Sequence, residues 1–215
     1  VFKVEVALAG ASGRWSVMAR RAYHHGDLRA TLIALATAHI AREGVETLSV
    51  RALAKEAGVA HRAAYQHFPD KDGLIAAVLT DAYAALAERC AAATADADTV
   101  EARRLAAARA YADFAAQSPQ LFLAMTGPRV NQSGEHKELE AALARAWRYI
   151  AGPIGEGVDA GLFTLADKRA AAAIFWGGLV GVLTQAALGR LKLKAAERAA
   201  FVEVVAERLI AGLKA

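Results

Sequence analysis

The stretch from Ser49 to Phe68 constrains the fold most strongly, because it has the pattern of two short helices separated by a glycine. Ser49 is placed to cap the first helix, and Gly58 ends it. The first helix has an apolar stripe with the spacing of an amphipathic helix. That stripe consists of Val50, Leu53, Ala54 and Ala57. A short helix, a turn containing glycine and a second helix together form a helix-turn-helix signature.

The second helix of the pair starts near Ala60. Ala64 and Phe68 are four residues apart and can both face inward. Basic and hydrogen-bonding side chains occupy the outward positions, which are His61, Arg62, Tyr65 and Gln66. A helix with such an outer face, placed after the turn, is a candidate for reading base edges in DNA.

The composition favours closely packed helices. Hydrophobic residues make up 56% of the 215 residues and aromatic residues only 7%, so much of the apolar content is alanine. The chain lacks the sustained alternation of β-branched residues that would predict a sheet. We therefore expect an all-α protein of about nine helices. The expected helices cover residues 27–43, 50–57, 60–68, 71–93, 100–117, a short segment opened by Pro119, 135–160 with a kink at Gly152-Pro153, 170–189 and 195–213.

Charge is unevenly distributed along the chain. Between Arg20 and Lys71 there are eight lysines and arginines and five acidic residues, which gives this quarter a net charge of +3. A basic segment suits a polyanionic partner such as DNA, although a solvated charged face would explain these residues nearly as well.

The segment from Tyr23 to Leu79 resembles the tetracycline-repressor (TetR) family of bacterial transcription regulators. YHHGDLR opens the first helix, and LSVRALAKEAGVAHRAAYQHFPDKDGLI follows. Weaker similarity continues through AYADFAAQSPQLFLAM and the helix around Trp176, which resembles a C-terminal domain of the Trp-His-Gly type with Val180-Gly181 in place of His-Gly. Two further departures are Ala60, where the family often has a capping Ser or Thr, and Gln66, where Arg is frequent.

The resemblance implies an all-helical homodimer with a three-helix DNA-binding head and a larger ligand-binding body. We expect a disordered or upstream extension over residues 1–19, the helix-turn-helix domain over 20–72, and the ligand-binding and dimerisation domain over 73–215. The implied function is that of a repressor that releases a palindromic operator when a small hydrophobic molecule binds the body. The alternative is a helical small-molecule-binding protein without specific DNA binding.

Eight residues are candidates for contacting DNA. They are His61, Arg62, Tyr65, Gln66, His67, Lys71, Arg51 and Arg21. Arg62 suits bidentate pairing with guanine, and Lys71, at the start of the next helix, suits a phosphate. Tyr65 and His67 resemble phosphate-contacting residues of the family, although Tyr65 could instead pack in the small core of the head. Arg51 could meet the DNA backbone or be only solvated.

Seven apolar residues of the expected body could line an effector cavity. They are Phe114, Phe122, Met125, Trp147, Phe163, Phe175 and Trp176. Each alone is more often a core residue than a pocket residue. Taken as a set, with few charges inside the body, they predict a hydrophobic or aromatic ligand.

The run from Ala170 to Gly189 has 20 consecutive uncharged residues, which is long enough to span a membrane. It is rich in alanine and glycine and contains Thr184 and Gln185, so we favour a helix buried on all sides. Small residues at 177, 178 and 181 would let a partner helix approach. The last helix has Phe201, Val204, Val205, Leu209 and Gly212 on one side. The family pairs its last two helices with those of a partner subunit, and these apolar faces fit that arrangement.

Catalytic and metal-binding patterns are absent from the sequence. It contains no nucleophile with a base, no metal-ligand cluster and no glycine-rich phosphate loop, so we expect neither an enzyme nor a cofactor. His24 and His25 could in principle bind a metal, but a basic arm is the better interpretation. The single cysteine, Cys90, fits a reducing cytoplasm and a packing role.

Overall fold

The computed structural model describes residues 28–127 and 134–214, and over these ranges the chain forms nine α-helices and no strand. The all-α prediction of about nine helices is therefore confirmed. The helices are α2 (Leu28–Glu43), α3 (Val50–Glu56), α4 (His61–His67), α5 (Lys71–Thr94), α6 (Val100–Gln117), α7 (Pro119–Thr126), α8 (Lys137–Asp159), α9 (Lys168–Ala187) and α10 (Ala195–Lys214). The expected extension over residues 1–19, the paired histidines and the first residue of the first expected helix, Asp27, lie outside the described residues.

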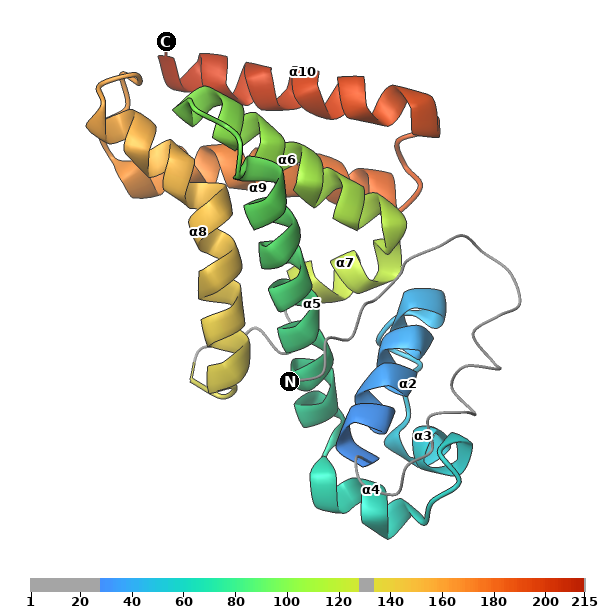
Figure 1. Cartoon of the computed structure of the whole chain (residues 1–215). Helices are drawn as coiled ribbons and strands as arrows, with labels where there is room; N and C mark the ends of the chain where they lie inside the picture. The colour runs from blue at the N-terminus through green and yellow to red at the C-terminus, as the bar shows by residue number, and fades with distance from the viewer. Residues whose placement is uncertain (1–27, 128–133, 215) are drawn as a thin grey trace.

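Helices α2, α3 and α4 form a small head at one end of the molecule (Figure 1). The hydroxyl of Ser49 accepts a hydrogen bond from the backbone N–H of Ala52 at 3.3 Å, as the predicted cap requires. Gly58 has φ +70° in the turn between α3 and α4, a conformation that residues with a side chain rarely adopt. Ala64 and Phe68 are buried beneath α4. The local sequence thus fixes which face of α4 turns outward.

Helix α5 connects the head to the body (Figure 1). It starts at the head, where a carboxylate oxygen of Asp70 accepts from the backbone N–H of Gly73 at 2.7 Å. Farther along, α5 packs against α6 and α8 in the body. The domain boundary expected between residues 72 and 73 falls in the first turn of this continuous helix and stays a prediction.

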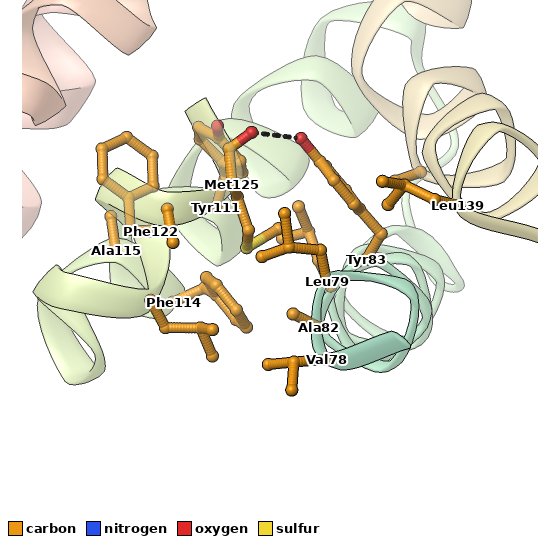
Figure 2. Close-up of a cluster of buried hydrophobic side chains, with 14 of the residues drawn as sticks. Val78, Leu79, Ala82, Tyr83, Tyr111, Phe114, Ala115, Phe122, Met125 and Leu139 are labelled. Carbon is orange, nitrogen blue, oxygen red and sulfur yellow. Dashed lines mark hydrogen bonds between the residues drawn. The ribbon is translucent and has the colours of Figure 1, made fainter. Parts of the chain in front are cut away.

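The body core is built around aromatic side chains from several helices. Figure 2 shows Tyr83 of α5 pointing toward the backbone carbonyl of Met125, at the end of α7. The Tyr83 hydroxyl donates a hydrogen bond of 2.7 Å to that oxygen. Burial raises the pKa of Tyr83 to about 12, so the hydroxyl keeps its hydrogen and remains a donor.

Tyr83→Phe is expected to lower the free energy of unfolding by about 1–3 kcal/mol, because it removes the hydroxyl and leaves a buried carbonyl less well satisfied. Urea denaturation of wild type and variant at equal protein concentration measures the difference. Tyr65→Phe is the matched control, because Tyr65 is 45% exposed. Its stability should stay within about 0.5 kcal/mol of wild type. Equal stability of the two variants would show that the Tyr83 hydrogen bond contributes nothing.

Helix α8 runs unbroken through Pro153, where the sequence predicts a kink. Figure 1 shows that α8 changes direction along its length. Pro153 lies in the second half of this helix. A proline inside a helix removes one N–H donor and crowds the preceding turn, which bends the helix.

The prediction that the uncharged helix is buried on all sides is wrong for the single chain. Ile174 is 48% exposed and Leu188 is 46% exposed, so one face of α9 has no cover from its own chain. The apolar side predicted for the last helix is also partly uncovered in the single chain, because Val204 is 54% exposed. The residues that α10 buries are Val202, Ala206, Ile210 and Leu213. Both α9 and α10 have apolar residues on two faces, so periodicity alone does not show which face packs against the body.

Within the described part of the chain, α9 is the one helix that is long and apolar enough to cross a membrane. Its most apolar window has a mean hydropathy of 1.5, and 28% of that window is buried. Length and composition alone are weak support for a membrane span.

Candidate nucleic-acid interface and effector site

Helix α4 presents all five of its predicted DNA-contacting side chains to solvent. They are His61, Arg62, Tyr65, Gln66 and His67. The exposure of Tyr65 at 45% argues against the alternative that it packs in the core of the head. The missing cap is also visible, because Ala60 provides no side-chain hydrogen bond to the first turn of α4.

Arg51 and His61 link α3 to α4. The Nε of Arg51 donates to Nε2 of His61 at 3.0 Å. Since Nε2 accepts in this bond, the ring hydrogen of a neutral His61 lies on Nδ1. The pair borders an open hollow of about 680 Å³ on the head, whose lining residues are Ser49, Arg51, Ala52, Lys55, Val59, Ala60 and His61. Arg51 therefore helps to orient the first residue of α4, a role that the sequence did not suggest.

Lys71 also has a contact within the protein. Its Nζ donates to the backbone carbonyl of Glu46 at 2.8 Å, which holds the segment between α2 and α3 against the start of α5. The lysine is half-buried. Its predicted role as a phosphate ligand stays a prediction, and any such role is combined with this structural one.

Two basic residues near the exposed face of α4 were not among the predicted DNA-contacting residues. Lys55 borders the hollow together with Arg51. The guanidinium carbon of Arg29 lies 5.4 Å from the centre of the Phe68 ring, next to the end of α4. A signal for Arg29 was present, because it belongs to the YHHGDLR segment. Arg21 lies outside the described residues.

The seven residues predicted to line a cavity mostly pack in the core. Phe114, Phe122 and Met125 are buried in the cluster of Figure 2. Phe163 covers Gly157 so closely that a Cβ on the glycine would lie 2.5 Å from its ring. Trp147 is 37% exposed and stacks edge-on against Trp176, with the ring centres 5.4 Å apart.

Phe175 and Trp176 are the two predicted residues that border a void in the body. Its lining residues are Arg104, Ala107, Ala108, Tyr111, Ile150, Phe175, Trp176 and Leu179. The void lies between α6, α8 and α9 and has essentially no room for a water molecule, so the body is closed in this structure. The expectation of few charges inside the body needs one correction, because Arg104 is only 7% exposed and borders the void.

Redox and metal chemistry find no support in the described residues. Cys90 is fully buried, and burial raises the pKa of its thiol to about 11, which disfavours the reactive thiolate. No group of three or more His, Cys, Asp or Glu side chains in the described ranges could hold a metal ion.

Two family models match separate parts of the chain. The model described as "Bacterial regulatory proteins, tetR family" matches residues 32–78, which contain α3, α4 and most of α2. The model described as "Tetracyclin repressor-like, C-terminal domain" matches residues 104–209. A solved protein of unknown function from Rhodococcus sp. RHA1 is 30% identical with a TM-score of 0.75, and the alignment covers 91% of this chain and 100% of that one. The chain belongs to the TetR family.

Other solved structures share the fold of this TetR-family protein at lower identity. The fatty acid degradation regulator FadR from Bacillus halodurans is 23% identical with a TM-score of 0.66, over 85% of this chain and 97% of that one. FadR from Bacillus subtilis, solved in complex with stearoyl-CoA, is 21% identical with a TM-score of 0.68, over 84% and 97%. No curated protein matches the chain. This TetR-family protein is a DNA-binding transcriptional regulator.

Proposed function

We propose that this regulator is a repressor whose homodimer binds a palindromic operator and releases it when a small hydrophobic molecule enters the body. The observation that carries the proposal is the outer face of α4, where all five of the DNA-contacting side chains predicted on this helix are exposed. Two such helices, one from each subunit, would enter successive major grooves about one helical turn apart.

Within the head, each residue would have a distinct role. Arg62 would pair with a base edge, while Tyr65 and His67 would contact phosphates beside it. The bond from Arg51 fixes the ring of His61 at the start of α4. Lys71 would contribute positive charge near the backbone while it holds the segment around Glu46.

The uncovered faces of α9 and α10 support a dimer formed through the last two helices. An added Cβ at Gly178 would lie 2.5 Å from Leu209, so this glycine serves the contact of α9 with α10 in the same chain. At Gly177 and Gly181, by contrast, an added Cβ would meet nothing within 4 Å. These two glycines lie on the side of α9 that includes exposed Ile174, where a second subunit could approach closely. A protein interface, rather than a membrane, would then cover α9 in the cytoplasm.

Helix α5 offers the mechanical link between effector and head. It starts in the head at Lys71, and it packs along much of its remaining length against α6 and α8, two of the helices around the void. A ligand that opens the void would shift α6 or α8 and with them α5. It would thereby favour a spacing of the two α4 helices that no longer fits the operator.

The effector would be apolar over most of its surface, because aromatic and aliphatic side chains dominate the void. FadR from Bacillus subtilis, with its bound stearoyl-CoA, shares the fold and gives a precedent for a ligand with a long apolar part. We assign no catalytic role to the chain.

Titration of the purified protein against DNA flanking its own gene tests the proposal. At physiological salt, a palindromic fragment should bind about 10³-fold or more tightly than random duplex of equal length. Affinity for both should fall as salt rises, because phosphate contacts release counterions. If the palindromic fragment bound no better than random duplex, the chain would instead be a helical small-molecule-binding protein.

A further inference from the structure

Arg104 is an unusual residue to find inside the body. It lies in α6, is only 7% exposed, and borders the void together with aromatic rings. Among the side chains that the structure describes, its Nε is the one buried nitrogen or oxygen with no hydrogen-bond partner. Buried guanidinium groups are normally paired with an anion, because the charge loses its hydration.

The charges around Arg104 do not balance. Its nearest carboxylate belongs to Glu101, one turn earlier, at 3.5 Å from the Nη2 nitrogen. The same Glu101 oxygen lies 3.5 Å from Nζ of Lys214, so one carboxylate serves two cations. The side chain of Glu101 is 67% exposed, where water screens its charge. Arg104, Lys214 and Glu101 together therefore have a net charge of +1. The positive charge of the buried Arg104 is the less well neutralised of the two.

The surroundings of Arg104 suit an apolar molecule. Tyr111, Phe175 and Trp176 border the void from α6 and α9, and Ala107 and Ala108 keep the facing wall of α6 small. Trp176 is half-buried between Tyr111, at 4.4 Å between ring centres, and Trp147, at 5.4 Å. Trp147 is partly exposed, and Trp176 borders the same void as Arg104. Movement of these two tryptophan rings would therefore open a path from solvent to Arg104.

We propose that the effector is a hydrophobic carboxylic acid whose carboxylate pairs with the guanidinium of Arg104 while its apolar part replaces the packing of Trp176 and Phe175. This inference rests on the proposed ligand response and specifies its chemistry. A carboxylate can accept two parallel hydrogen bonds from a guanidinium, including one from the Nε that now has no partner. The bound acid would also supply the charge that Glu101 supplies only in part.

The experiment compares acids with neutral molecules of the same shape. Decanoate is paired with decanol, and 1-naphthoate with 1-naphthol, and each is titrated by calorimetry into the full-length protein in the absence of DNA. We expect each acid to bind about tenfold or more tightly than its neutral counterpart, because a charge-assisted bidentate pair forms in a site of low dielectric. Decyl phosphate tests whether another anionic group can replace the carboxylate.

Arg104→Met replaces the arginine with an unbranched apolar side chain of similar length and removes the charge. This variant should lose the preference for acids and should melt, without ligand, at or above the wild-type temperature, because an incompletely paired buried charge has been removed. Arg109→Met, on the same helix, is the matched control. Arg109 is exposed and pairs with Glu203, so the variant should keep the preference.

Four outcomes would overturn the inference, and the first three concern the comparison between ligands and variants. These three are equal binding of acids and their neutral counterparts, a preference for acids that survives Arg104→Met, and binding of decyl phosphate without binding of either carboxylate. Failure of every acid to bind at millimolar concentration would overturn it as well. Operator binding is measured separately on unliganded protein, so a regulator that binds its operator but ignores acids refutes only this inference.

Discussion

Ile174→Asp is expected to turn the dimer into a monomer and to reduce operator affinity. In the proposed dimer, the two copies of the aspartate would lie at or near the paired α9 helices, where each would lose its hydration without gaining a partner. An uncompensated buried charge costs roughly 3–5 kcal/mol, which corresponds to a loss of about 100-fold or more in dimer affinity. A single head then keeps only half of the contacts to DNA.

Light scattering at micromolar concentration measures the mass of the variant, and a titration with the palindromic fragment measures its affinity. The protein should fold normally, because Ile174 is 48% exposed in the single chain. Leu162→Asp is the matched control. Leu162 is 52% exposed, but it lies in the turn between α8 and α9, so this variant should remain dimeric. A dimeric Ile174→Asp protein would place the subunit interface elsewhere.

Arg62→Ala is expected to abolish most of the preference for the operator over random DNA. A bidentate contact between arginine and guanine contributes about 1–3 kcal/mol of discrimination, and a dimer loses two of them. The total of about 2–6 kcal/mol corresponds to a loss of about 30-fold or more in specificity. Stability should change little, because the side chain is exposed on α4.

Titrations of the operator and of random duplex at one salt concentration give the specificity ratio for each variant. Arg42→Ala is the control for the loss of one positive charge from the head, because Arg42 is exposed in the last turn of α2. That end of α2 lies near α7, since Gly44 is close to Gln120. This variant should leave the ratio unchanged. Arg62→Ala protein with an undiminished ratio would remove this residue from base recognition. Lys71→Ala is a poorer probe of phosphate contact, since it also removes the bond to Glu46.

The sequence predicts the head well because its signals are local. The cap at Ser49 and the turn at Gly58 each involve residues only a few positions apart, and the structure contains both. The contacts of Arg51 with His61 and of Lys71 with Glu46 could not be predicted in the same way. They depend on how separate helices come together, which no short-range pattern encodes.

Prediction was weaker in the body because alanine and glycine are compatible with either face of a helix. On α10 the choice between Val202 and Val204 as the buried residue is decided by where α6 and α9 lie, and the sequence pattern allows both. The aromatic residues were a fair guide to the core, but Arg104 was not singled out. Its position just after the start of α6 gives no indication that the side chain turns inward.

Because the void is closed, the packing of the body would affect the effector concentration to which such a regulator responds. Since the void has no space before binding, an effector molecule that binds there would first have to meet a body whose α6, α8 and α9 have separated. The observed dissociation constant then equals the intrinsic one divided by the fraction of open bodies. In the proposed mechanism, the effector concentration that releases the operator would therefore depend on core packing as well as on recognition. A substitution that loosens the packing around Trp176 would change that concentration without contacting either ligand or DNA.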